Sequence, residues 1–151
     1  ISQPYVVARM IEALRAGREL GRTLEIGAGC GYQAAVLAQL TQEVYAVERI
    51  APLLAKAKLN LRAIKELKVR LKHADGQLGL PEAAPFDSII VAAAAARVPR
   101  ALLQQLAPHG RLILPLGVST QQLALIEFRP EGFVETRLDA VRFVPLLSGV
   151  E

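Results

Sequence analysis

The chain has 151 residues, of which 52% are hydrophobic and 21% are charged, and it carries a formal net charge of +4. This composition is too apolar and too mixed for a disordered chain, and the length suits one core, so we expect a single domain over residues 1–151. The single cysteine, Cys30, excludes an internal disulfide and a cysteine-rich metal centre, and two isolated histidines give no ligand spacing, so no metal site is expected.

The chain shows no sign of export or membrane insertion. No apolar run reaches the roughly 18 residues that a membrane helix needs, and the first residues lack the pattern of a signal peptide. We therefore expect a cytoplasmic protein. The chain begins on Ile1 without an initiator methionine, so we expect a preceding segment to be missing.

Hydrophobic periodicity predicts alternating helices and strands along the chain. In the first helix, Ser2 is a candidate N-cap, Pro4 suits the first turn and Gly17 ends the helix. The elements predicted after it are a strand over 22–26, a helix over 31–40, a strand over 43–47, a helix over 51–64, strands over 68–74 and 86–94, a helix over 100–106 and a strand over 110–117.

Nearly continuous apolar strands between helices predict a parallel sheet that is buried on both faces. From Gln121 onward apolar and polar residues alternate, and turn residues at 130–132 predict an antiparallel pair that closes the sheet. The predicted fold class is therefore α/β, with a doubly wound, mostly parallel seven-stranded sheet.

The stretch LEIGAGCGYQAA, residues 24–35, places three glycines behind a predicted strand that carries a carboxylate. Doubly wound sheets bind ligands beyond the carboxyl ends of their strands. Gly27, Gly29 and Gly31 allow a tight turn and close approach of a ligand, and the next helix offers free amides. The spacing departs from the dinucleotide pattern G-x-G-x-x-G, and Glu25 would repel a pyrophosphate. The same carboxylate favours a ligand with an ammonium or a sulfonium.

Two further acids follow the next two predicted strands. Glu48 ends the second strand, where a carboxylate can accept hydrogen bonds from both hydroxyls of a ribose. Asp75 follows the third strand, where it could accept a hydrogen bond from an adenine amino group. Taken singly, each acid also fits a strand end or a turn. Together with Glu25 they predict a nucleoside with a cationic amino-acid tail, which is S-adenosylmethionine.

Seven stretches in chain order carry a resemblance to a known family: ISQPYVVARM, LEIGAGCGYQAAVLA, VYAVERI, HADG, APFDSIIVAAAA, LAPHGRLILPLG and VRFVPLLSG. The chain resembles the protein-L-isoaspartate O-methyltransferase family. The glycine loop and the acids are common to many methyltransferases, whereas ISQP and VRFVPL are more restricted. The resemblance implies a Rossmann-like S-adenosylmethionine-dependent methyltransferase fold. It also implies a repair enzyme that methylates the carboxylate of L-isoaspartyl residues in damaged proteins and peptides and leaves S-adenosyl-L-homocysteine. We expect the protein to be a monomer.

The resemblance also implies the site residues. Ser2 is implied as the active-site residue, whose hydroxyl holds the isoaspartyl carboxylate against the methyl group; without the resemblance it would be a simple N-cap. Ala93, Val144 and Pro145 are implied contacts of the substrate, although the terminal segment could equally be core. The implied cofactor contacts are Glu25, Gly27, Ala28, Gly29, Cys30, Gly31, Tyr32, Glu48, Arg49, Ile50, Asp75 and Gly76.

The chemistry of this reaction requires no general base. A substrate carboxylate is already ionised at neutral pH and can attack a methyl sulfonium directly, so alignment and exclusion of water are what the reaction needs. We therefore expect structural roles for His73 and His109. The chain departs from the family in lacking an N-terminal segment that ends in Gly-Gln-Thr, so we expect part of one wall of the site to be missing.

Three different functions also remain open from the residues. Seven basic residues between Lys56 and Lys72, opposed only by Glu66, could bind nucleic acid. Base methylation on this fold usually needs a polar residue, two prolines and an aromatic after the fourth strand, whereas the sequence there is VAAAAARVP, so we interpret the basic run as a solvated face and expect no nucleic-acid or membrane partner. A small-molecule methyltransferase is the second function, and an inactive fragment that binds S-adenosylmethionine is the third.

Overall fold

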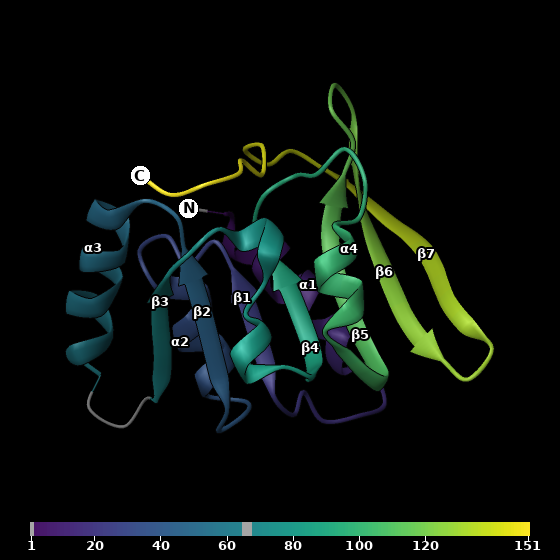
Figure 1. The fold of residues 1–151 in the computed structure, drawn as a ribbon, viewed down its shortest axis with the longest axis horizontal. Helices are drawn as coiled ribbons and strands as arrows, with labels where there is room; N and C mark the ends of the chain where they lie inside the picture. Colours follow the sequence, from purple (N-terminus) through teal and green to yellow (C-terminus); the bar gives the residue numbers. More distant parts are fainter. Residues whose placement is uncertain (1, 65–67) are drawn as a thin grey trace.

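The computed structural model describes residues 2–64 and 68–151. Among these residues seven strands form one sheet in the order β3-β2-β1-β4-β5-β6-β7 (Figure 1). The first five strands are parallel, and the last two are antiparallel to their neighbours. The strands are β1 (Thr23–Ile26), β2 (Val44–Glu48), β3 (Val69–His73), β4 (Phe86–Val91), β5 (Leu106–Leu116), β6 (Gln121–Arg129) and β7 (Gly132–Val141). The predicted doubly wound, mostly parallel sheet is confirmed.

Helices cover both faces of the sheet, as Figure 1 shows for α1 and α2 behind it and α4 in front. Leu14 of α1 and Leu37 of α2 share one core cluster with Ile90, whereas Leu102 of α4 packs with Ile89 on the other face. The strands are apolar on both sides because each side is buried. The helices are α1 (Pro4–Arg15), α2 (Tyr32–Ala38), α3 (Ala51–Arg62) and α4 (Arg100–Gln104), with single 3-10 turns η1 (Gly76–Leu78) and η2 (Pro81–Ala83).

The predicted elements are all present, with small differences at their ends. The second helix is shorter than predicted. The strand β5 begins at Leu106, earlier than the predicted start at residue 110, because Leu106 already pairs with Phe86 of β4 before a shift of register. The N-cap of α1 is Gln3, not Ser2. The N-cap prediction for Ser2 is therefore wrong, because the helix begins at Pro4 and the residue before it, Gln3, is the cap position and makes no side-chain cap bond.

The chain after β7 returns across the carboxyl ends of the parallel strands toward α3, as the yellow segment of Figure 1 shows. We call residues 144–151 the C-terminal strap. The Leu146 amide donates to the Ala94 carbonyl at 2.8 Å, and the Ala94 amide donates to the Val144 carbonyl at 2.7 Å. At the far end the Glu151 amide donates to the Arg49 carbonyl at 2.7 Å. Backbone bonds therefore fix the strap at both ends.

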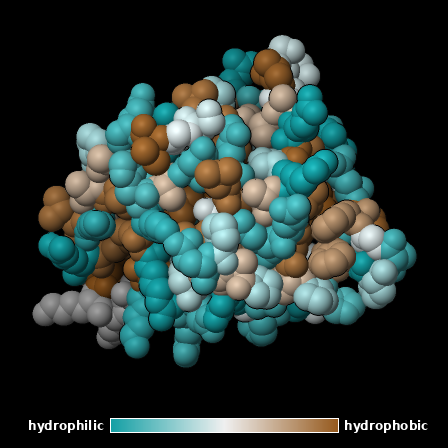
Figure 2. Space-filling model, viewed as in Figure 1, coloured by the Kyte–Doolittle hydropathy of each residue, from teal (hydrophilic) through white to brown (hydrophobic). Residues whose placement is uncertain are grey.

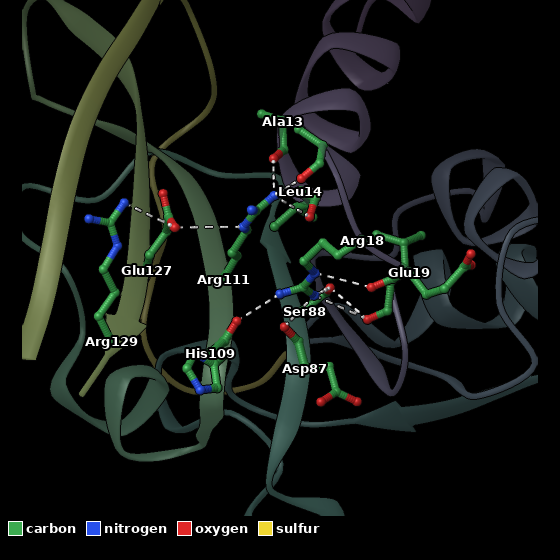
Figure 3. Close-up of polar contacts among 12 residues, drawn as sticks. Ala13, Leu14, Arg18, Glu19, Asp87, Ser88, His109, Arg111, Glu127 and Arg129 are labelled. Atoms are coloured by element: carbon green, nitrogen blue, oxygen red, sulfur yellow. Dashed lines mark hydrogen bonds and ion pairs between the residues drawn. The ribbon is translucent and has the colours of Figure 1, made fainter.

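A polar network ties the opposite end of the sheet to α1 (Figure 3). Arg111 of β5 donates from Nη1 to the carbonyls of Ala13, Leu14 and Ala16, at 3.3, 3.2 and 2.8 Å. These carbonyls lie at the end of α1, where they have no partner within the helix. Arg18 donates to the Asp87 carbonyl at 2.7 Å, and burial, with the neighbouring Arg111, lowers the pKa of its guanidinium.

The surface seen in Figure 2 is mixed, with hydrophobic residues in several separate groups among hydrophilic ones. None of the helices in the described residues combines the length and the apolarity needed to cross a bilayer. The basic residues at 56, 58, 62, 68, 70 and 72 are exposed, whereas Lys65 and Glu66 lie outside the described residues.

Candidate functional site

A cavity of about 610 Å³ lies at the carboxyl ends of β1, β2 and β4. The chain runs from β1 outward to β3 and then returns to β4 on the other side of β1, so this is the point where strand order reverses. The volume lies in the range of small-molecule sites. The lining joins the glycine loop, the end of β2, residues after β4, the strap and Ser2 from the first residues of the chain.

The glycine loop after β1 forms one side of the cavity. The amides of Gly27 and Ala28 donate to the Val47 carbonyl of β2, at 2.9 and 3.0 Å. Gly29 has φ 55°, and a Cβ there would meet no atom within 4 Å, which leaves its face open. Gly31 has φ 93° and packs against Leu61 of α3, so it supports the loop and does not line the cavity.

Glu48 is fixed by backbone amides, one of which belongs to the glycine loop. Its side chain lines the cavity although only 5% of the residue is exposed. Oε1 accepts from the Gly29 amide at 2.8 Å, and Oε2 accepts from the Ile50 amide at 3.0 Å. Because each carboxylate oxygen has two acceptor sites, both oxygens can still accept from a ligand. The geometry suits a pair of neighbouring hydroxyls.

Glu25 lies behind the cavity and does not line it. It is fully buried, and its Oε2 accepts from Nε2 of Gln33 at 2.8 Å. Burial raises the pKa of the Glu25 carboxyl to about 8; the hydrogen bond from Gln33 opposes this shift, and the charge of Glu48 adds to it. Gln33 does line the cavity. Sequence reasoning missed it, although it is the one polar side chain that follows Tyr32 in the Ala- and Leu-rich helix α2.

Asp75 does not line the cavity, and both of its carboxylate oxygens accept hydrogen bonds from backbone amides. Oδ1 accepts from the Gln77 amide at 2.9 Å and caps η1. Oδ2 accepts from the Gly149 amide of the strap at 2.8 Å. The following residue, Gly76, does line the cavity. The structure shows the turn role for Asp75, and its contact with an adenine amino group stays a prediction.

Arg49, the residue after Glu48, holds the strap from inside the cavity lining. Its guanidinium donates to the carbonyls of Ser148 at 3.2 Å and Gly149 at 3.1 Å, and it pairs with the Glu151 carboxylate at 3.3 Å. His73 lies beside these contacts, with Nε2 2.8 Å from the Arg49 carbonyl. The remaining predicted cofactor contacts in the lining are Ala28, Cys30, Tyr32 and Ile50.

The predicted substrate residues meet on the other side of the cavity. Ser2, Ala93, Val144 and Pro145 all line it. Ser2 is partly buried, and its hydroxyl makes no hydrogen bond within the described residues. Val144 is 70% exposed, whereas the nearby Phe143 packs against the core cluster of α1. The terminal segment therefore supplies core on one side and a cavity wall on the other.

A family model and several curated proteins match this chain over its length. The family model described as protein-L-isoaspartate(D-aspartate) O-methyltransferase matches residues 1–151. The protein-L-isoaspartate O-methyltransferase of Dechloromonas aromatica strain RCB is 72% identical over 152 residues, which cover 100% of this chain and 70% of that protein.

Solved structures show the same likeness. One, titled protein-L-isoaspartate O-methyltransferase, has a TM-score of 0.87 at 29% identity and covers 99% of this chain and 49% of that chain. Another, from Plasmodium falciparum and in complex with S-adenosyl-L-homocysteine, has a TM-score of 0.80 at 28% identity and covers 97% of this chain and 75% of that one. The expected Rossmann-like methyltransferase fold is confirmed.

Proposed function

The chain belongs to the protein-L-isoaspartate(D-aspartate) O-methyltransferase family, and from this we infer that it transfers a methyl group from S-adenosylmethionine to the carboxylate of L-isoaspartyl residues in proteins and peptides. The observation that carries the proposal is the composition of one cavity. Its lining joins the glycine loop and Glu48, which suit the cofactor, with Ser2 and Val144 from opposite ends of the chain.

The cavity presents groups that suit separate parts of the cofactor. When bound, S-adenosylmethionine supplies a methyl group on a positively charged sulfur. Glu48 accepts from the two ribose hydroxyls with the free acceptor sites of Oε1 and Oε2, and the bare backbone at Gly29 allows close approach. Ile50 and Gly76 line the part of the cavity that follows β2 and β3, where the adenine ring lies in this proposal.

The substrate side works by alignment. The Ser2 hydroxyl, which has no partner within the described residues, donates to the isoaspartyl carboxylate and fixes its direction. Val144, Pro145 and Ala93 form an apolar wall that excludes water from the nucleophile. The carboxylate is ionised at neutral pH, so no side chain has to remove a proton from it.

Several properties complete the proposal. Residues 1–151 act as one methyltransferase domain, as a monomer in the cytoplasm, without a nucleic-acid or membrane partner. The side chains of Ala92 and Ala93, which line the cavity after β4, offer no polar or aromatic contact to a flipped base. This lining weighs against a methyltransferase that acts on nucleic-acid bases.

Methyl transfer to a matched pair of peptides tests the function. Labelled S-adenosylmethionine should label a peptide that contains L-isoaspartate and leave the same peptide with normal aspartate unlabelled. Ser2→Ala should lower kcat/KM for the isoaspartyl peptide by about 10- to 100-fold, the loss of one hydrogen bond to a charged group, without weakening cofactor binding. Equal labelling of both peptides would exclude the proposed substrate, and binding of the cofactor without labelling of either would identify an inactive fragment.

A further inference from the structure

Two neighbouring side chains beneath the glycine loop leave buried acceptors without a donor. Gln33 donates from Nε2 to Oε2 of Glu25 at 2.8 Å. Glu25 Oε1 and Gln33 Oε1 each expose less than 1 Å² and have no hydrogen-bond partner within the described residues. Buried polar atoms are nearly always paired, and leaving one unpaired is costly. What this pair lacks is donors, because both unpaired atoms are acceptors.

The charges around the pair give Glu25 no cation within the described residues. On β2 the nearest acid is Glu48, whose charge disfavours ionisation of Glu25, and on β4 the residue paired in register with Glu25 is Ile90. On α2 the partner is the neutral amide of Gln33. Of the cations that line the cavity, Arg49 is engaged by the strap, and neither Lys56 nor Arg142 contacts Glu25.

We propose that Gln33 is a positioning residue for the cofactor, whose amide oxygen accepts a hydrogen bond from the ammonium of the amino-acid tail of S-adenosylmethionine, and that Glu25 behind it releases a proton when this ammonium arrives. The inference rests on the proposed function and extends it to a residue that the sequence did not single out. Gln33 is the member of the pair that lines the cavity, so the ammonium meets Gln33 and not Glu25.

The proton balance is simple. In the free protein the Glu25 carboxyl keeps its proton at neutral pH, because burial raises its pKa to about 8. That proton supplies one donor to a pair that lacks them. An ammonium brings three donors and a positive charge, which lowers the pKa of the carboxyl. The O–H bond of Glu25 then breaks, the proton passes to the buffer, and no other covalent bond changes. Affinity should therefore rise with pH up to about 8.

Calorimetry with two ligands tests the proposal. S-Adenosyl-L-homocysteine carries the amino-acid tail, whereas 5′-methylthioadenosine has the same adenosine and thioether without the ammonium. Titration at pH 7 in phosphate and in Tris, which differ in heat of ionisation, gives the number of protons released. We expect close to one proton per S-adenosyl-L-homocysteine bound and none per 5′-methylthioadenosine.

The variant Gln33→Met keeps the length of the side chain and removes its hydrogen bonds. It should weaken S-adenosyl-L-homocysteine by about tenfold or more and leave 5′-methylthioadenosine unchanged. Equal weakening of both ligands, or no proton release with S-adenosyl-L-homocysteine, would overturn the role of the pair. If neither ligand binds the wild type, the proposed function fails instead. If the variant does not fold, the proton counts of the wild type with the two ligands decide the question.

Discussion

At the scale of single residues, Glu48 both orients the glycine loop and offers acceptors to the cofactor. Glu48→Ala removes the acceptors and the two bonds to the Gly29 and Ile50 amides. We expect S-adenosyl-L-homocysteine to bind about 1 to 3 kcal/mol more weakly, measured by calorimetry, because hydrogen bonds to a charged acceptor are lost. Glu82→Ala, which removes an exposed acid outside the cavity lining, is the matched control. Unchanged affinity in Glu48→Ala would remove Glu48 from the ribose role.

Glu25 gives a second prediction, for stability. Its pKa is raised from 4.5 to about 8 in the folded chain, so between these values the unfolded chain has lost a proton that the folded chain retains. Stability from this group is complete below pH 4.5 and is lost as pH rises toward 8, by up to about 5 kcal/mol. Urea unfolding at several pH values should show that the free energy of unfolding falls as pH rises in the wild type and that this fall is absent in Glu25→Gln. The same dependence of unfolding free energy on pH in both proteins would contradict this prediction.

The acids show how far single residues can be predicted. Glu48 ends the parallel strand β2 and Asp75 follows the parallel strand β3, so position and residue type alone suggest a ligand contact for both. They differ in that Glu48 lines the cavity and Asp75 does not; Asp75 instead accepts from the Gly149 amide of the strap, a contact between residues 74 positions apart. Gln33 was missed for a related reason, since its partner Glu25 is 8 positions away across the loop. A local sequence pattern cannot predict either of these two contacts.

At the scale of elements, the C-terminal strap forms a wall that is separable from the core. Val144→Asp places a negative charge beside an anionic substrate at a position that is 70% exposed. We expect the peptide KM to rise by about tenfold or more, through charge repulsion, with cofactor affinity and melting temperature nearly unchanged. Val118→Asp, at another exposed valine that does not line the cavity, should leave KM unaffected. Loss of folding in Val144→Asp would show that the segment is core there.

The attachment of α1 to the sheet gives the next prediction. Arg111→Met keeps most of the apolar stem but frees the three carbonyls that the guanidinium caps. Denaturant unfolding should show a loss of about 1.5 to 3 kcal/mol, the scale of hydrogen bonds to a charged group. Cofactor affinity should stay the same, because Arg111 does not line the cavity. Arg129→Met, whose side chain is 44% exposed, is the control and should cost little. Equal losses would contradict the capping role.

At the scale of the whole molecule, the net charge of +4 should produce only nonspecific attraction to nucleic acid. Binding of duplex DNA, followed by fluorescence anisotropy, should weaken by at least about tenfold between 50 and 200 mM salt, because counterion release drives it. Sequence-selective binding that survives the higher salt would instead support a nucleic-acid methyltransferase.

The sheet as a whole could be predicted because strand and helix periods alternate along the chain, and seven buried or half-buried strands leave few arrangements. The order of the last two strands could not, since β6 and β7 have similar alternating patterns and either could have paired with β5. In the structure β6 pairs with β5 and β7 forms the edge. The path of the strap depends on this order, because it leaves the sheet from β7.

The strap has a consequence for how the protein comes into being on the ribosome. Domains generally fold from the N-terminus during synthesis, and the parallel strands together with α1 precede the strap by many residues. The cavity nevertheless needs Val144 and Pro145 beside Ser2. While Val144 and Pro145 are still inside the translating ribosome, the wall that they form is absent, so the sheet can form before the substrate side of the cavity does. The complete cavity can therefore stabilise the folded protein through cofactor binding by mass action only after these residues have left the ribosome.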